Sequence, residues 1–272
     1  MSKWPEQFCL AVTVSLCIAF TVPLQASPPT TAIDQTWHYD PALKAMIVTI
    51  VNTSDKDITA YNLSVKVTLS NGVNEFQVTH DFLNVATLLD SVKGTRAEQE
   101  LAEQVGPRSL PARGSYDEKI PVGGGFKNFE AVLDVVVFSD KTAEATNGPA
   151  LQRLIASRKA KAMTIQKANE TITAVLSDTT LESPHADASA KVQGICDAWK
   201  AKSPNDATVM NEGEFKIIIQ DLKQAPLRRG NASEADYLKS YMVLKAKEQS
   251  TWIENAQLVL VGEKPYKPRR PS

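Results

Sequence analysis

The sequence predicts an α+β protein in which an antiparallel β-sandwich precedes an α-helical region. Apolar and polar residues alternate from about residue 36 to 139, as in strands with one buried face. From there to about residue 261, apolar residues recur every three or four positions, as in amphipathic helices. We therefore expect a β-sandwich domain at 27–142 and a helical region at 143–262.

The two ends of the chain have compositions of their own. Residues 1–26 resemble an export signal, with Lys3, an uncharged apolar core at 8–22, and the small residue Ala26 at the expected cleavage site. The apolar core is shorter than the roughly 20 residues that a membrane-spanning helix needs. We expect cleavage, a periplasmic or extracellular mature chain and no transmembrane helix in it; retention as an anchor is the alternative. The basic, proline-rich tail at 263–272 is expected to be extended.

Composition indicates an ordinary globular chain, with 43% hydrophobic residues, 22% charged residues and a net charge of −1. Charge is uneven, because residues 27–140 carry a net −6 and residues 141–272 a net +5. The two parts could therefore attract each other electrostatically. Cys9 and Cys17 lie within the signal, so the mature chain has only Cys196 and cannot form an internal disulfide. Cys196 lies at helical spacing and is expected to be a buried apolar residue.

The strand pattern is clearest at Ile58–Ser70, where every second residue is apolar. Asn71-Gly72 is a preferred hairpin turn and leads into a second strand at about 74–82. Further strands are predicted at about 43–51, 116–122 and 129–139. Six or seven strands joined by hairpin turns are typical of an immunoglobulin-like or related β-sandwich.

The alternation fails between Asn84 and Gly114, where a short helical insertion is predicted. Thr95-Arg96-Ala97-Glu98 has the form of a capping box, and Gly106-Pro107 ends the pattern. So long an insertion is a candidate binding site, for which we single out Leu88 and Leu89. Alternatively, these leucines only cover an open end of the sheet.

Four helices are predicted after the strands. They are expected to begin near Asn147, Ser183, Glu212 and Ser233, and the last one is expected to reach about Val261. Arg158 falls inside the apolar stripe of the first of these helices and is expected to snorkel to the surface. Glu248 shares a face with aromatic residues of the last helix, where we expect a partly exposed carboxylate; a proton-transfer group is the alternative.

Trp37, Tyr39 and His80 are the other candidate binding residues. Trp37 and Tyr39 lie on one face of a strand and could stack on a sugar, although two such rings in a sandwich are usually part of the core. His80 lies on an apolar strand face, with His38 and Asp40 as further metal-ligand types. No two histidines have a spacing typical of a zinc site, so a hydrogen-bonded core histidine is the preferred interpretation and no metal is expected.

No catalytic motif is recognisable. The sequence has no Gly-x-Ser-x-Gly, Ser-x-x-Lys or His-Glu-x-x-His, and Gly123-Gly124-Gly125 is not followed by the lysine of a phosphate-binding loop. Basic residues are spread around the predicted helices rather than gathered on one side, which argues against nucleic acid. We therefore expect no catalytic residues and no cofactor.

Three segments of the strand region carry a resemblance to known proteins. They are the stretch from Val51-Asn52-Thr53-Ser54 through Leu69-Ser70-Asn71-Gly72, then Leu110-Pro111-Ala112-Arg113-Gly114-Ser115, and Val137-Phe138-Ser139-Asp140. Together they resemble the immunoglobulin-like β-sandwich modules of exported bacterial proteins of unknown function. The resemblance covers about 110 residues, rests on turn chemistry and implies no catalytic residues.

Two functional hypotheses remain open. The first is a non-catalytic protein of the cell envelope that acts through protein–protein interaction or as a scaffold. The second is a module that binds glycan or cell wall, with weak hydrolytic activity as an option, which would use Trp37, Tyr39 and His80. The expected partner is accordingly another envelope protein or a cell-wall glycan.

Overall fold

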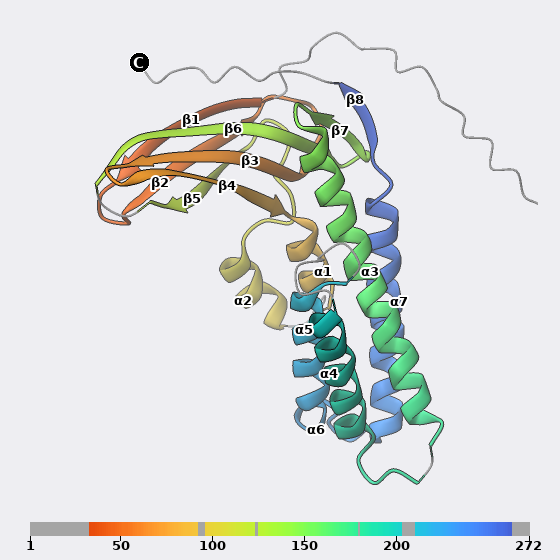
Figure 1. The fold of residues 1–272 in the computed structure, drawn as a ribbon. Helices are drawn as coiled ribbons and strands as arrows, with labels where there is room; N and C mark the ends of the chain where they lie inside the picture. The colour runs from red at the N-terminus through yellow and green to blue at the C-terminus, as the bar shows by residue number, and fades with distance from the viewer. Residues whose placement is uncertain (1–32, 92–95, 123–124, 179, 203–209, 263–272) are drawn as a thin grey trace, which may run out of the picture.

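The computed structural model describes residues 33–91, 96–122, 125–178, 180–202 and 210–262, and it confirms a mixed α+β fold. The strands come mainly from the first part of the chain and the helices mainly from the second part (Figure 1). The predicted signal at 1–26 and the basic tail at 263–272 lie outside the described residues. No helix in the described ranges is both long enough and apolar enough to cross a membrane.

The strands form two sheets. One has three antiparallel strands in the order β1-β2-β5, and the other has five strands in the order β4-β3-β6-β7-β8. Their bounds are β1 Ile33–Asp40, β2 Ala45–Asn52, β3 Ile58–Leu69, β4 Gly72–Asp81, β5 Ser115–Pro121, β6 Phe126–Phe138, β7 Thr142–Ala145 and β8 Val259–Gly262. The predicted hairpin joins β3 to β4, with Leu69 paired to Gly72, so the turn residues are Ser70 and Asn71.

The two sheets face each other across one apolar core. Leu63, Val65 and Val67 of β3 point into it, as the alternation predicted, and meet residues of β2 such as Val48 and Ile50. The intervening residues of β3 point to the opposite side of the five-stranded sheet. That opposite side is called the outer face below.

Seven helices connect and follow these strands in the described part of the chain. Their bounds are α1 Leu83–Ser91, α2 Arg96–Val105, α3 Gly148–Leu176, α4 Pro184–Lys202, α5 Glu212–Lys223, α6 Ala225–Arg228 and α7 Glu234–Asn255. The insertion between β4 and β5 thus contains two helices rather than the single predicted one. Thr95, the predicted cap of α2, lies outside the described residues.

Local sequence signals account for the starts of the long helices. The side chain of Asn147 accepts a hydrogen bond from the backbone of Ala150, and Ser233 does the same for Asp236, so both are N-caps. The helices bury a second apolar core, to which Trp252 and Phe215 contribute large side chains. Cys196 is buried in this core, as predicted, and burial raises the pKa of its thiol.

The prediction for the end of the last helix is wrong. Helix α7 ends at Asn255, and the chain then forms β8, which pairs in parallel with β7. Val259, Leu260 and Val261 are apolar residues of the kind that strands favour, and pairing with β7 satisfies the backbone groups on that side of β8. The chain therefore returns from the helices to the sheet, and both predicted regions contribute strands to the same sheet (Figure 1).

Helix α3 packs on part of the outer face. Leu151 and Leu154 of α3 contact the small and branched residues Ala60, Val135 and Val137 of β3 and β6. These contacts bury apolar surface, which contributes roughly 25 cal/mol per Å². The interface between sheet and helices is therefore partly apolar, and the ion pair described next adds to it.

Arg158 does not snorkel, which corrects the prediction. Its side chain is 1% exposed, and its Nε and Nη2 each donate to a different carboxylate oxygen of Asp81, both at 2.9 Å. Its Nη1 donates to the carbonyl of Asn255 at the end of α7, at 2.6 Å. Such a two-point pair fits the planar guanidinium, and it allows a cation to lie within an apolar stripe. Arg158 thereby joins β4, α3 and α7.

Strand β8 provides a test of this arrangement. We expect Leu260→Ser to lower the free energy of unfolding by about 1–2 kcal/mol, because Leu260 packs against the α3 interface. The matched substitution Val259→Ser, at a side chain that is 60% exposed, should change it by less than about 0.5 kcal/mol. Urea unfolding measures both. Equal effects of the two substitutions would contradict the description of β8.

Candidate functional site

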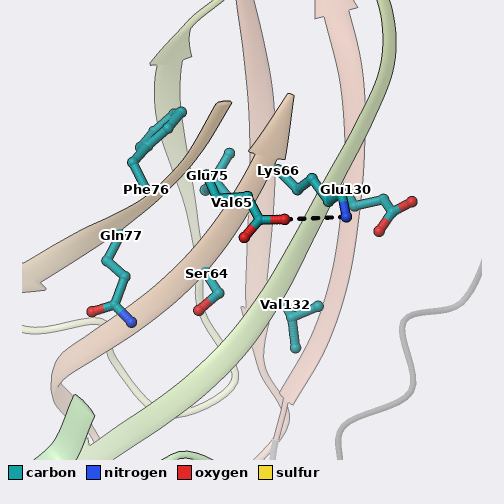
Figure 2. Close-up of a pocket in the computed structure, with 8 residues that line it drawn as sticks. All are labelled: Ser64, Val65, Lys66, Glu75, Phe76, Gln77, Glu130 and Val132. Carbon is teal, nitrogen blue, oxygen red and sulfur yellow. Dashed lines mark ion pairs between the residues drawn. The ribbon is translucent and has the colours of Figure 1, made fainter. Parts of the chain in front are cut away.

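The uncovered part of the outer face forms a groove across three strands. We define the outer groove by Ser64 and Lys66 of β3, Glu75 and Gln77 of β4, and Glu130 and Val132 of β6 (Figure 2). The strand register arranges these six residues in two rows. Glu75, Lys66 and Glu130 face one another in one row, and Gln77, Ser64 and Val132 in the next.

Charged groups in the outer groove remain open to solvent. Lys66 Nζ lies 3.1 Å from Glu75 Oε1, and both side chains are about half exposed or more. Glu130 accepts a hydrogen bond from Asn128 at 3.1 Å. The groove has a volume of about 400 Å³ and carries one more acidic than basic side chain. It can therefore accept a cationic group without a large loss of existing interactions, because exposed ion pairs contribute only about 0–1 kcal/mol.

Helix α3 closes one end of the outer groove. Arg153 of α3 donates to Gln77 Oε1 at 2.6 Å. In the next row Asn62 is buried, whereas Thr79 on β4 stays exposed and accepts a hydrogen bond from Asn62. Asp134 is an extra residue of β6 at a bulge, and its buried carboxylate accepts hydrogen bonds from Ser64 and Asn147. The start of α3 lies at this carboxylate, so the helix dipole favours its negative charge. The closed end is thus held in place by side-chain hydrogen bonds.

His80 lies on the other face of β4, toward the three-stranded sheet. Its Nδ1 is 3.0 Å from Glu118 Oε2 of β5, and the same oxygen accepts a 2.5 Å hydrogen bond from the buried hydroxyl of Tyr61. The His80 ring stacks on Tyr61 and also contacts Phe82 and Tyr116. His80 is therefore a hydrogen-bonded histidine at the edge of the core, and the cluster links β3 and β4 to β5.

The electrostatics of this cluster follow from burial and hydrogen bonding. Burial alone would raise the pKa of Glu118, but hydrogen bonds from His80 and Tyr61 hold it below its ordinary value. Burial, with the adjacent negative charge of Glu118, raises the pKa of Tyr61 far above its usual range and also raises that of Tyr116. The carboxylate form of Glu118 and the neutral phenols are thus the stable states.

Trp37 and Tyr39 both lie on the side of β1 that faces the core. Trp37 packs edge-on against Phe129 at 6.2 Å between ring centroids, and Tyr39 packs against Phe126 at 4.9 Å. Both rings are partly buried against the core between the sheets. The structure does not bring His80 together with them, so the glycan-binding hypothesis draws no support from this set of residues.

Leu88 and Leu89 point in different directions from α1. Leu89 is buried, whereas Leu88 is 43% exposed. They do not form a joint surface, and a role for Leu88 in binding stays a prediction.

A buried charge network lies among the helices, and sequence reasoning missed most of it. Lys245 Nζ is 3.1 Å from Glu214 Oε1 and 2.8 Å from Glu248 Oε2. The indole of Trp252 donates to Glu248 at 3.4 Å, and Lys161 lies over the Trp252 ring at 4.2 Å. Burial raises the pKa of Glu214 and lowers that of Lys161, whereas the two carboxylates raise that of Lys245 against the effect of burial. Glu248 is thus a partner of Lys245 in this network.

The described residues contain no group of three or more histidine, cysteine, aspartate or glutamate side chains that could hold a metal ion. His38 and Asp40, the other candidates from the sequence, lie on β1, whereas His80 lies on β4 of the opposite sheet. His38, Asp40 and His80 are therefore not assembled into one metal site in this part of the chain.

The outer groove was not found by sequence reasoning. Four of its six residues are polar members of the alternating strands β3 and β4, which the period-two pattern assigns only to the side away from the core, and the other two come from β6. That pattern does not show which residues face one another across the strands. It also does not show how much of the outer face α3 covers. One local signal could have indicated the groove. Once the hairpin fixes the register of β3 and β4, the polar residues Glu75, Gln77 and Thr79 lie beside the polar residues Ser64 and Lys66.

Comparisons with known proteins add little. No protein-family model matches the chain, and no curated protein matches it. Among solved structures, the chain is similar to a hypothetical protein from Peptoclostridium difficile 630, with 11% identity and a TM-score of 0.26 over 46% of this chain and 91% of that one. A similarity this low supports no conclusion about fold or function.

The Glu118 cluster predicts a specific pH dependence. Because the folded state lowers the pKa of Glu118 below the ordinary value of about 4.3, the stabilisation is present above that pH and is lost as the pH falls through the folded pKa. We expect Glu118→Gln to cost about 1–3 kcal/mol at pH 7 and progressively less below about pH 4.

The control is Asp117→Asn on the same strand, where the carboxylate is exposed and accepts only from Thr49. It should change stability by less than about 0.5 kcal/mol. Urea unfolding at several pH values measures both variants. A Glu118→Gln penalty that stays constant down to pH 3 would show that the charge of Glu118 is not the source of the stabilisation.

Proposed function

We propose that this chain is a non-catalytic protein of the cell envelope, exported by the signal at 1–26, that binds another envelope protein through the outer groove. The observation that carries the proposal is the groove itself, a concave and polar region on an uncovered sheet face. The lack of recognisable catalytic motifs in the sequence motivates the non-catalytic part. The export signal motivates a periplasmic or extracellular location.

The chemistry of the outer groove favours a protein segment that presents a basic side chain. Glu75 and Glu130 flank Lys66 at neighbouring positions, so a lysine or arginine of a partner can pair with either acid. Val132 and Ser64 in the adjacent row offer an apolar and a hydrogen-bonding contact. The floor is formed by adjacent strands of a sheet, so little conformational entropy is lost on binding.

We also infer that the two sheets form an immunoglobulin-like sandwich. The support is their strand order: the first, second and fifth strands form one sheet, and the fourth, third, sixth and seventh form the other. Immunoglobulin-type domains combine strands A, B, E and D in one sheet and C, F and G in the other, and variable types add C′ and C″ to the second sheet. The three-stranded sheet of this chain would match A, B and E, without a strand D among the described residues. On this proposal β8 and the helices are additions to that sandwich.

Site-specific photocrosslinking tests the proposed function. A photoreactive phenylalanine analogue is placed at Glu130, and in a matched control at Thr36, an exposed residue of β1 on the other sheet. We expect crosslinking in envelope extracts to give a discrete protein adduct from position 130 but not from position 36. Combined Glu75→Lys and Glu130→Lys substitutions should reduce capture about tenfold or more, because they repel a basic segment.

Identical adducts from both positions, or no adduct from position 130, would overturn the proposal. So would undiminished capture by the doubly substituted chain, provided that circular dichroism shows it to be folded.

A further inference from the structure

Strand β4 is an open edge of the five-stranded sheet. Among the described strands it pairs only with β3, so about half of the backbone donors and acceptors along its ten residues point away from the sheet. The other terminal strands are shorter: β8 has four residues, β5 has seven and β1 has eight. A long unpaired strand is a template for a further strand.

The side chains of β4 favour association rather than protection. Edge strands are usually guarded by exposed lysine or by proline, and β4 contains neither. Val73 is 51% exposed and Phe76 is 40% exposed, so both faces of the strand present apolar surface at this edge. Of its two acidic residues, Glu75 is paired with Lys66, and Asp81 is held by Arg158.

In an antiparallel pairing of β4 with a second copy of itself, the facing side chains are compatible in shape and in charge. If two β4 strands run antiparallel about a twofold axis at Gln77, Phe76 of each copy faces Val78 of the other. Aromatic and β-branched residues form favourable cross-strand pairs. In the same register Glu75 faces Thr79, so no like charges are opposed.

We propose that a second copy of this chain pairs with β4 in this antiparallel register, so that two five-stranded sheets join into one. The outer groove extends to Glu75 and Gln77 on β4, the last strand of the sheet. In the dimer the outer face therefore continues from Glu75 and Gln77 of one copy to the same two residues of the second copy. The two grooves then form one twofold-symmetric surface across the joined sheets. The dimer does not depend on the proposed function, since its mass is measured without any partner.

Light scattering coupled to size exclusion, with sedimentation velocity, tests the dimer on the purified full chain. We expect a mass of twice 29.7 kDa at micromolar concentration. Phe76→Lys should raise the dimer dissociation constant by about 30-fold, because it removes two symmetry-related pairs and adds a charge at the edge. The matched control Val259→Lys, on the opposite terminal strand of the same sheet, should leave the mass unchanged.

A disulfide test fixes the register and covers the case in which Phe76→Lys does not fold. Residues that face each other in antiparallel strands have Cα atoms about 4.5–5.5 Å apart, within the range for disulfides. With Cys9, Cys17 and Cys196 replaced by serine, Gln77→Cys should crosslink two chains under mild oxidation, and Val259→Cys should not.

A monomeric mass at all concentrations would overturn the proposal. A dimer that survives Phe76→Lys, or a Val259→Cys chain that crosslinks as readily as Gln77→Cys, would equally overturn it by placing the interface elsewhere. Glu130→Lys separates this inference from the proposed function, since it should lower partner capture and leave the mass unchanged.

Discussion

The buried pair of Arg158 and Asp81 determines how the helices stand on the sheet. Asp81 is the last residue of β4, and Arg158 lies about one helical turn after Leu154, which contacts the sheet. Arg158 also reaches the end of α7 through Asn255. A guanidinium in an apolar interface is costly unless its donors are satisfied. Here the guanidinium donates two hydrogen bonds to Asp81 of β4 and one to Asn255 of α7. The pair therefore fixes the positions of β4, α3 and α7 relative to one another.

The packing of α3 on the sheet also determines where the outer groove lies. The outer face is buried at Ala60 and Asn62 of β3, where α3 packs nearby, and Arg153 marks the boundary through its hydrogen bond to Gln77. Beyond that boundary the same strands carry polar side chains that remain in solvent. Just after the end of α7 that Arg158 contacts, the chain returns as β8, so the sheet is bounded by a strand from the end of the described chain. The polar surface is thus a consequence of how far α3 extends along the sheet.

The sequence was sufficient for features that depend on neighbouring residues. Alternation located β3, the turn signal located its hairpin with β4, and capping residues located α3 and α7. Features that depend on distant residues were missed. The partner of Arg158 lies 77 positions away, and β8 was assigned to a helix because its pairing with β7 leaves no local signal. The outer groove requires the register of three strands, which no single segment contains.

A double-mutant cycle on Asp81 and Arg158 tests the central claim most directly. Urea unfolding is measured for the wild type, Asp81→Ala, Arg158→Ala and the double variant. Each single substitution should cost about 3–5 kcal/mol, because it leaves a buried charge without its partner. The double substitution should cost less than the sum by about 2–3 kcal/mol. Costs that add to within about 0.5 kcal/mol would contradict the claim that this pair joins the sheet to the helices.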